Sequence, residues 1–191
     1  RVLVNSILSP QEIFNPQNGL FNKKGISSTS NADIKEDRSN GNFNQNKEIP
    51  FKTVSNLLSI FKQRKSNGSI RYYYASAGGL YPIDIYIYVK PGRVENLEGG
   101  LYYYSPMEHA LHRVTDGPVI TDAVYFPENK SIFQSSALSV YMIYNADVTM
   151  PKYGGLGYFM ASIDAGIMVG TMTQWSECLG IGVCTTGKID F

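Results

Sequence analysis

Residues that bind metals or form disulfides are scarce in this chain of 191 residues. It has two cysteines, Cys178 and Cys184, and two histidines, His109 and His112, and their spacing matches no zinc motif. We therefore predict no metal site. Two thiols near an apolar C-terminal stretch are most often buried, so we expect two buried thiols rather than a redox pair.

An excess of either charge is also missing. The chain has 17 Lys and Arg against 16 Asp and Glu, so neither nucleic acid nor an anionic membrane is expected as the main partner. No apolar run reaches the length that spans a bilayer, and the N-terminus lacks a signal-peptide pattern. We expect a cytoplasmic protein. Because the sequence begins at Arg1 without Met, we also expect that it is cut from a larger polypeptide.

The composition changes along the chain. Residues 21–48 are rich in Asn, Lys, Ser and Gly and have few large apolar side chains, which is typical of an extended polar arm. From Pro50 onward the apolar residues become periodic. We predict a polar N-terminal arm or subdomain over residues 1–49 and one folded domain over residues 50–191.

Periodicity predicts the elements of that domain. A helix begins at Pro50, has Lys62, Arg64 and Lys65 in its last turn, and ends at Gly68; this basic cluster is interpreted as a solvated helix end. Apolar alternation or β-branched runs predict strands over residues 83–89, 101–104, 110–114, 137–144 and 181–183. A long helix is predicted over residues 156–178. This order indicates a mixed α+β domain.

The long helix carries two patterns. Its large apolar side chains, which we expect on one face or its flanks, include Phe159, Ile163, Ile167 and Trp175. A second set of small residues forms a strip that allows another backbone or helix to approach closely: Ala161, Ala165, Gly166 and Gly170. We expect this helix to contribute to a dimer interface, although a buried contact within one chain explains the strip nearly as well.

Three small-residue segments are candidates for a site. The first segment consists of Ser76, Ala77, Gly78 and Gly79. Because it precedes a strand, it is no dinucleotide-binding fingerprint. It either exposes backbone amides to a planar ligand or forms an ordinary tight turn. Residues 180–188 either approach a ring or merely end the long helix. Lys152 and Tyr153 form an acid–base pair if their heads converge, because the ammonium lowers the pKa of the tyrosine; otherwise they belong to an ordinary loop.

These segments resemble a known family when they are taken together. The chain is similar to the azoline dehydrogenases of the nitroreductase-like flavin superfamily in a series of segments that occur in the same order. These segments are residues 74–89, 90–94, 100–111, 152–154, 164–166, 180–184, Gly187 and 189–191. The tyrosine-rich hairpin and the polar arm are most similar to the oxidase domains of nonribosomal peptide synthetases. The resemblance implies a mixed or antiparallel sheet flanked by helices, in a homodimer that holds FMN at its interface, and a family fold that continues past Phe191.

The resemblance also assigns roles to residues. It implies flavin contacts from Ser76, Ala77, Gly78 and Gly79 and from a second group: Gly182, Cys184, Gly187 and Lys188. Arg38 and Ser39 match part of a motif for the flavin phosphate, although Gly41 stands where a second Arg is expected. The Lys–Tyr pair belongs to the proton-transfer step, with Tyr153 as base and Lys152 stabilising its anion.

The activity that follows is oxidation of a thiazoline or oxazoline to the thiazole or oxazole. The ring belongs to an intermediate bound to a peptidyl carrier domain, hydride passes to the flavin, and dioxygen is the electron acceptor. Three alternatives stay open. They are an azoline dehydrogenase that acts on a ribosomal peptide, a flavoenzyme of the nitroreductase type that uses NAD(P)H, and a docking domain that binds no flavin.

Overall fold

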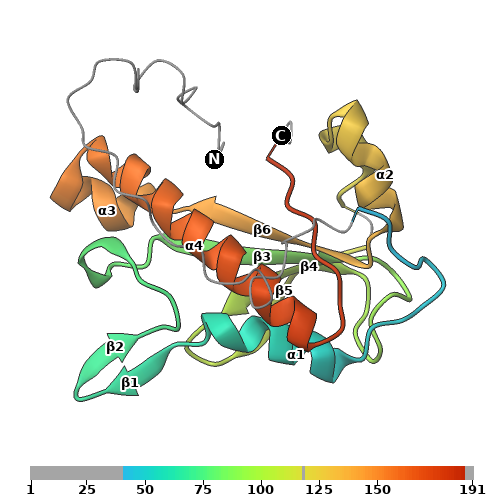
Figure 1. Cartoon of the computed structure of the whole chain (residues 1–191), viewed down its shortest axis with the longest axis horizontal. Helices are drawn as coiled ribbons and strands as arrows, with labels where there is room; N and C mark the ends of the chain where they lie inside the picture. Colours follow the sequence, from blue (N-terminus) through green and yellow to red (C-terminus); the bar gives the residue numbers. More distant parts are fainter. Residues whose placement is uncertain (1–40, 118, 188–191) are drawn as a thin grey trace, which may run out of the picture. The chain divides into compact units, whose positions relative to one another are not determined.

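A four-stranded antiparallel sheet organises the residues that the computed structural model describes, 41–117 and 119–187 (Figure 1). Its strands are β3 (Ile83–Val89), β4 (Gly100–Ser105), β5 (Ala110–Asp116) and β6 (Leu138–Tyr144), in the order β5-β4-β3-β6. The four strands predicted in these regions are confirmed, and so is the mixed α+β class. The described residues all fall within one compact unit.

Both faces of the central strand β3 are covered. Ile83, Ile85, Ile87 and Val89 alternate toward the main core, which the helices α1 (Phe51–Leu58) and α4 (Leu156–Cys178) close. On the other face, Tyr88 packs with aromatic residues of the segment around α2 (Pro127–Ser135). A strand buried on both faces needs no polar alternation, so tyrosine occupies positions where serine or lysine would face water.

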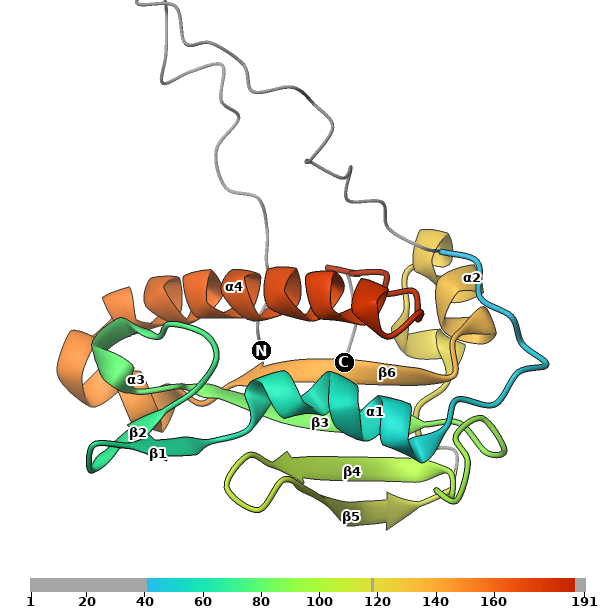
Figure 2. The same ribbon diagram turned by 60° about the horizontal axis from the view of Figure 1, so that its bottom comes forward.

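The long helix α4 has the predicted bounds, but Phe159, Ile163 and Ile167 face outward, while Met168 and Met172 are buried in the core. Figure 2 shows α4 along one face of the sheet, and Trp175 at its C-terminal end donates a hydrogen bond to the Asn56 carbonyl of α1 at 2.8 Å. Ala161 and Ala165 are buried in the core, whereas Phe159 is 59% exposed and Ile163 is 45% exposed. Ala161 and Ala165 face the core because their small side chains let the helix axis lie close to the sheet.

The remainder of the small-residue strip lies elsewhere on α4. Gly166 and Gly170 are exposed, and a methyl group placed on either would meet nothing within 4 Å. The strip is therefore divided between the core and the outer surface of this chain. The expectation of two buried thiols was wrong, because Cys178 is exposed in the last helical turn and Cys184 is only half-buried.

The end of the first helix also differs from the prediction. The α-helix stops at Leu58 and continues only as a 3₁₀ turn, Ser59–Phe61. Its predicted basic last turn is instead the hairpin of β1 (Arg64–Ser66) and β2 (Ser69–Arg71). Asn67 and Gly68 connect the strands with φ values of 50° and 75°, as an Asn-Gly hairpin turn requires. That dipeptide is the signal which the helical interpretation overlooked.

Other differences concern short elements. The expected strand over residues 181–183 does not form, although Ile181 and Val183 pack partly buried against the core. The structure adds α2, α3 (Ala146–Tyr153) and two 3₁₀ turns, Ala77–Gly79 and Asp122–Val124. No helix among the described residues is long and apolar enough to cross a membrane. Most of the predicted polar arm, 1–40, lies outside the described residues.

Candidate functional site

The structure brings two of the predicted segments together at Gly78. A methyl group built on Gly78 would lie 2.5 Å from the Tyr153 hydroxyl and 2.8 Å from the Lys152 ammonium. The last turn of α3 carries both side chains, and Gly154 ends that helix with φ of 55°. The heads of Lys152 and Tyr153 therefore converge on one point, which is the condition for an acid–base pair.

The side chains of Lys152 and Tyr153 also lie close to each other. The Lys152 ammonium lies 5.0 Å from the centroid of the Tyr153 ring, within the range of a cation–π contact. Tyr153 is half-buried and Lys152 is exposed, so the pair borders solvent.

The turn opposite the pair has a backbone that only glycine adopts readily. Gly78 has φ of 63° and Gly79 has φ of 67°. Gly78 has no room for a side chain because Tyr153 and Lys152 occupy the space, whereas a methyl group on Gly79 would meet nothing within 4 Å. One glycine thus permits contact with α3, and the next leaves backbone open for a ligand.

A buried carboxylate fastens this turn to α4. The Ser76 hydroxyl donates a hydrogen bond of 2.5 Å to Asp164 Oδ2 and accepts one of 2.9 Å from the Tyr81 backbone N–H. Asp164 is only 3% exposed. Because an unpaired buried carboxylate is costly, the Ser76 hydroxyl is held firmly, and it holds the turn. Asp164 belonged to the quoted resemblance, but no local pattern indicated this role.

Fewer backbone amides are free in the turn than the sequence suggested. Gly79 N–H donates to the Ser76 carbonyl at 3.0 Å, and Leu80 N–H donates to the Ala77 carbonyl at 3.3 Å. With Tyr81 N–H bonded to Ser76, three successive amides are used inside the turn. Among the hydrogen bonds of the described residues, the amides of Ser76, Ala77 and Gly78 have no such internal partner.

Tyrosines pack behind the turn, and their environment separates them from Tyr153. The rings of Tyr72 and Tyr81 lie 4.1 Å apart, and Tyr74 contacts both. Burial raises the pKa of Tyr72 and of Tyr74, and neighbouring tyrosines raise it further. These two phenols stay protonated near neutral pH. Tyr153, in contrast, is only half-buried and lies beside the exposed Lys152 ammonium.

The second predicted group of flavin contacts is placed differently. Gly182, Cys184 and Gly187 lie in the irregular segment that leaves α4 at the end remote from α3 (Figure 1). Burial raises the pKa of the Cys184 thiol. Within the described part of the chain, no hydrogen bond or ring contact joins this segment to Lys152 or Tyr153. The predicted contacts Arg38, Ser39 and Lys188 lie outside the described residues.

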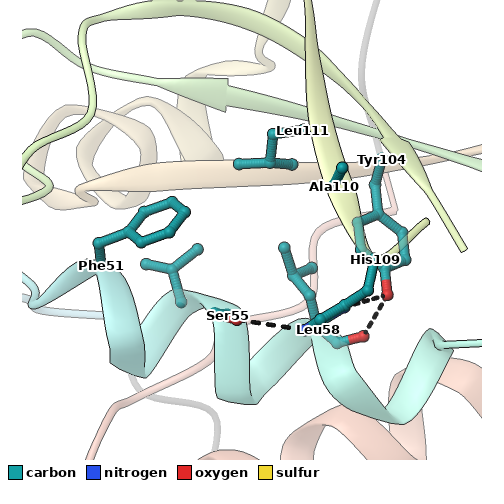
Figure 3. Close-up of a pocket in the computed structure, with 8 residues that line it drawn as sticks. Phe51, Ser55, Leu58, Tyr104, His109, Ala110 and Leu111 are labelled. Atoms are coloured by element: carbon teal, nitrogen blue, oxygen red, sulfur yellow. Dashed lines mark hydrogen bonds between the residues drawn. The ribbon is translucent and has the colours of Figure 1, made fainter.

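A second polar cluster was missed because the histidines were considered only as metal ligands. His109 lies between Ser55 of α1 and Tyr104 of β4, beside a mostly apolar cavity of about 80 Å³ (Figure 3). The Tyr104 hydroxyl has one proton, which the Leu58 carbonyl accepts at 3.0 Å. The 2.8 Å contact of that hydroxyl with His109 must therefore use the Nδ1 proton.

The tautomer of His109 follows from this network. With the proton on Nδ1, Nε2 accepts a hydrogen bond of 3.2 Å from the Ser55 hydroxyl. Burial lowers the pKa of His109, and the nearby Lys62 ammonium lowers it further. The neutral ring thus ties α1 to the turn between β4 and β5. We interpret it as a structural connection. Among the described residues, no group of three His, Cys, Asp or Glu side chains could hold a metal ion.

Comparison with known families gives a clear match. Residues 34–191 match the model of the Nitroreductase family. The chain is 26% identical over 175 residues to the microcin B17-processing protein McbC of Escherichia coli, covering 88% of this chain and 62% of McbC. It is 25% identical over 112 residues to the nitroreductase-named protein MJ1384 of Methanocaldococcus jannaschii, covering 59% and 56%. The chain thus spans less than two thirds of either relative.

Solved structures show the same fold. The E. coli microcin synthetase McbBCD complex with truncated pro-MccB17 bound contains a chain with a TM-score of 0.73 and 22% identity. The match covers 94% of this chain and 71% of that one. A nitroreductase-type protein of Anabaena variabilis has a TM-score of 0.61 and 21% identity, over 77% of this chain and 30% of that chain. The predicted nitroreductase-like fold is confirmed.

Proposed function

Because this chain belongs to the nitroreductase family, we propose that it is an FMN-dependent oxidoreductase that converts a peptide thiazoline or oxazoline to the thiazole or oxazole. The observation that carries this proposal is the convergence of Lys152 and Tyr153 on Gly78. Similarity to a protein that processes microcin B17 supports a peptide substrate. An acid–base pair beside an open glycine turn has the parts that removal of a ring proton requires.

The described residues fit a flavin ring. The turn Ser76–Gly79 offers free space beside Gly79 and the backbone amides of Ala77 and Gly78, which no hydrogen bond inside the turn uses. A flat ring system with a polar edge is complementary to such a combination. We propose the remaining contacts from Gly182, Cys184, Gly187 and, outside the described residues, Arg38, Ser39 and Lys188. Bound FMN supplies the redox chemistry by accepting a hydride and returning the electrons to dioxygen.

In this proposal, residues of the protein itself remove the proton from the azoline ring. As tyrosinate, Tyr153 accepts the proton that leaves the azoline carbon, on its own phenol oxygen. The Lys152 ammonium lies beside the Tyr153 ring and pairs with the negative charge that the phenol oxygen carries before transfer. Gly78 keeps the turn within van der Waals distance of the hydroxyl, and the Asp164–Ser76 hydrogen bond keeps the turn in place. Correct positioning of the base is itself a large contribution to the rate of proton transfer.

We place a homodimer interface on α4. Phe159, Ile163 and Ile167 form an exposed apolar row on this helix, and Gly166 and Gly170 leave open space beside them. A contiguous apolar surface of this kind marks an interaction site, and small residues allow a second helix to approach closely. A second copy of the chain would cover the row.

Two classes of peptide fit the proposed reaction. The tyrosine-rich hairpin and the polar arm are similar to synthetase oxidase domains, which favours an intermediate bound to a peptidyl carrier domain. The relative McbC processes microcin B17, and a structural neighbour contains bound pro-MccB17, which favours a ribosomal peptide as the second candidate. Turnover of the same model ring on a carrier thioester and on a linear peptide distinguishes the two.

The purified protein tests the function directly. We expect a yellow protein that releases FMN on denaturation, and whose flavin is bleached by a model thiazoline thioester in anaerobic stopped flow without nicotinamide. A protein that stays colourless after incubation with FMN contradicts the proposal. A flavin that only NAD(P)H reduces identifies the alternative, an enzyme of the nitroreductase type.

A further inference from the structure

The hairpin of β1 and β2 carries an unbalanced positive charge. Lys62, Arg64, Lys65 and Arg71 lie within this short segment, and residues 62–73 contain no acidic residue. All six strand residues are exposed, and so is Lys62. Within residues 41–117 and 119–187, no ion pair neutralises these four cations. The balanced charge of the whole chain thus conceals a local concentration of positive charge.

The register of the hairpin increases the electrostatic cost. Arg64 lies directly opposite Arg71, and like charges at opposed positions destabilise a strand pair. Because side chains alternate across a strand, both arginines lie on the same face of the hairpin. Arg64 also lies over the ring of Tyr73, 3.4 Å from its centroid, and that ring is 58% exposed. This face is cationic and aromatic, and nothing in the described chain offsets its charge.

The hairpin also has free backbone edges. Among the strands of the described residues, its two strands pair only with each other and form a sheet separate from the main one. The base is fixed, because Gln63 N–H donates to the Pro106 carbonyl at 2.9 Å and the Tyr72 hydroxyl bonds to Gln63. In both views the hairpin lies at the same end of the molecule as α3 (Figures 1 and 2). A fixed hairpin with free edges is a template for a further strand.

We propose that this hairpin docks an acidic, extended polypeptide segment, which adds a strand to a free edge and pairs its carboxylates with the cations. A polypeptide uses both features, whereas a nucleic acid or a lipid surface uses only the charge. Residues 72–75 lead from β2 directly to the turn at Ser76–Gly79, so the docked segment lies next to the candidate site. That this segment belongs to the polypeptide bearing the azoline rests on the proposed function; the binding itself does not.

A labelled peptide of alternating Glu and Val serves as the probe, and its binding to the purified protein is followed by fluorescence anisotropy at several salt concentrations. We expect binding that weakens as salt rises, and little binding of the matching Gln and Val peptide. The variant Lys65→Glu/Arg71→Glu should bind the acidic peptide about tenfold or more weakly, because two attractions become repulsions. This variant keeps its fold, since the new Glu at position 71 faces Arg64.

The control variant Lys47→Glu/Lys52→Glu changes net charge equally at two exposed lysines away from the hairpin, and it should bind nearly as the wild type does. A backbone-methylated version of the acidic peptide keeps the charges but cannot complete a strand ladder, so it should also bind about tenfold more weakly. The proposal is overturned if the methylated and unmethylated acidic peptides bind equally well. It is also overturned if the hairpin variant and the control variant lose the same amount of peptide affinity.

Two further probes separate other partners. Tighter binding of a DNA duplex, or of vesicles containing phosphatidylserine, than of the acidic peptide replaces this proposal with a different partner. No binding of any probe means that the cations only guard the hairpin edge against aggregation, which also overturns it. Peptide binding without azoline turnover supports the docking surface and refutes the proposed function.

Discussion

Replacing Gly78 by alanine tests whether contact between the turn and Tyr153 positions the proposed base. The added methyl group would lie 2.5 Å from the Tyr153 hydroxyl, whereas ordinary contact begins at 3.4 Å. The hydroxyl must therefore retreat by about 0.9 Å, the difference between these distances, unless the turn itself moves. The Lys152 ammonium, at 2.8 Å, ends a flexible chain and moves more easily than the rigid phenol ring.

Two costs follow, and a control separates them. Gly78 has φ of 63°, and a left-handed backbone costs alanine about 1–2 kcal/mol, which lowers Tm by roughly 2–8 °C for a chain of this size. Gly92 has φ of 67° with nothing within 4 Å, so Gly92→Ala has the same backbone cost without the clash. A displacement of about 1 Å at a reacting group lowers the rate on the order of a hundredfold.

The assay is anaerobic flavin reduction by a model thiazoline thioester at saturating FMN, with thermal unfolding measured in parallel. We expect Gly78→Ala to be reduced about a hundredfold more slowly than Gly92→Ala, and to be at least as destabilised. Equal reduction rates in the two variants would refute the reasoning, because they would show that the position of Tyr153 beside Gly78 has no part in proton transfer.

The remaining predictions concern the base, the half-buried His109 and the outer face of α4. Tyr153→Phe should retain flavin and reduce it about a hundredfold or more slowly, and wild-type rates would exclude it as the base. Lys152→Met should also slow reduction, because the proposed tyrosinate loses the cation beside it; the two losses should be less than additive. The pKa of His109 is lower in the folded protein than its ordinary 6.5, so the unfolded chain takes up the proton first. Stability should therefore decline as pH falls through 6.5, and urea unfolding of His109→Asn should show a smaller decline. Phe159→Asp should yield a monomer in light scattering and weaken flavin binding, and a dimer that persists with full flavin would place the interface elsewhere.

Local patterns were sufficient where neighbouring residues decide the conformation. The alternating isoleucines of β3 predicted the bounds of that strand, and the helical spacing of apolar residues from Leu156 to Cys178 predicted α4. The early end of α1 was also readable in principle, because Asn67 and Gly68 form a hairpin turn by their own backbone preferences. Arg38, Ser39 and Lys188 stay predictions, since they lie outside the described residues.

The site required the tertiary structure. The sequence predicted that Lys152 and Tyr153 act together, and it predicted a tight turn at Gly78, but no spacing brings α3 to that turn. The contact of Ser76 with Asp164 is equally remote along the chain. Such pairs meet only because α3 packs against α4 and α4 covers one face of the sheet, and long-range packing leaves no periodic trace in the sequence.

The orientation of α4 shows the same division most clearly. Its sequence by itself determined that the segment is a helix with one set of large apolar residues and another of small ones. Only the tertiary structure decided that Ala161 and Ala165 face the core while Phe159 and Ile163 face outward. Hydrophobicity alone favours burying the larger set. The two alanines face the core because close approach of the helix axis gives denser packing, and Phe159 and Ile163 are then left on the outer surface of α4.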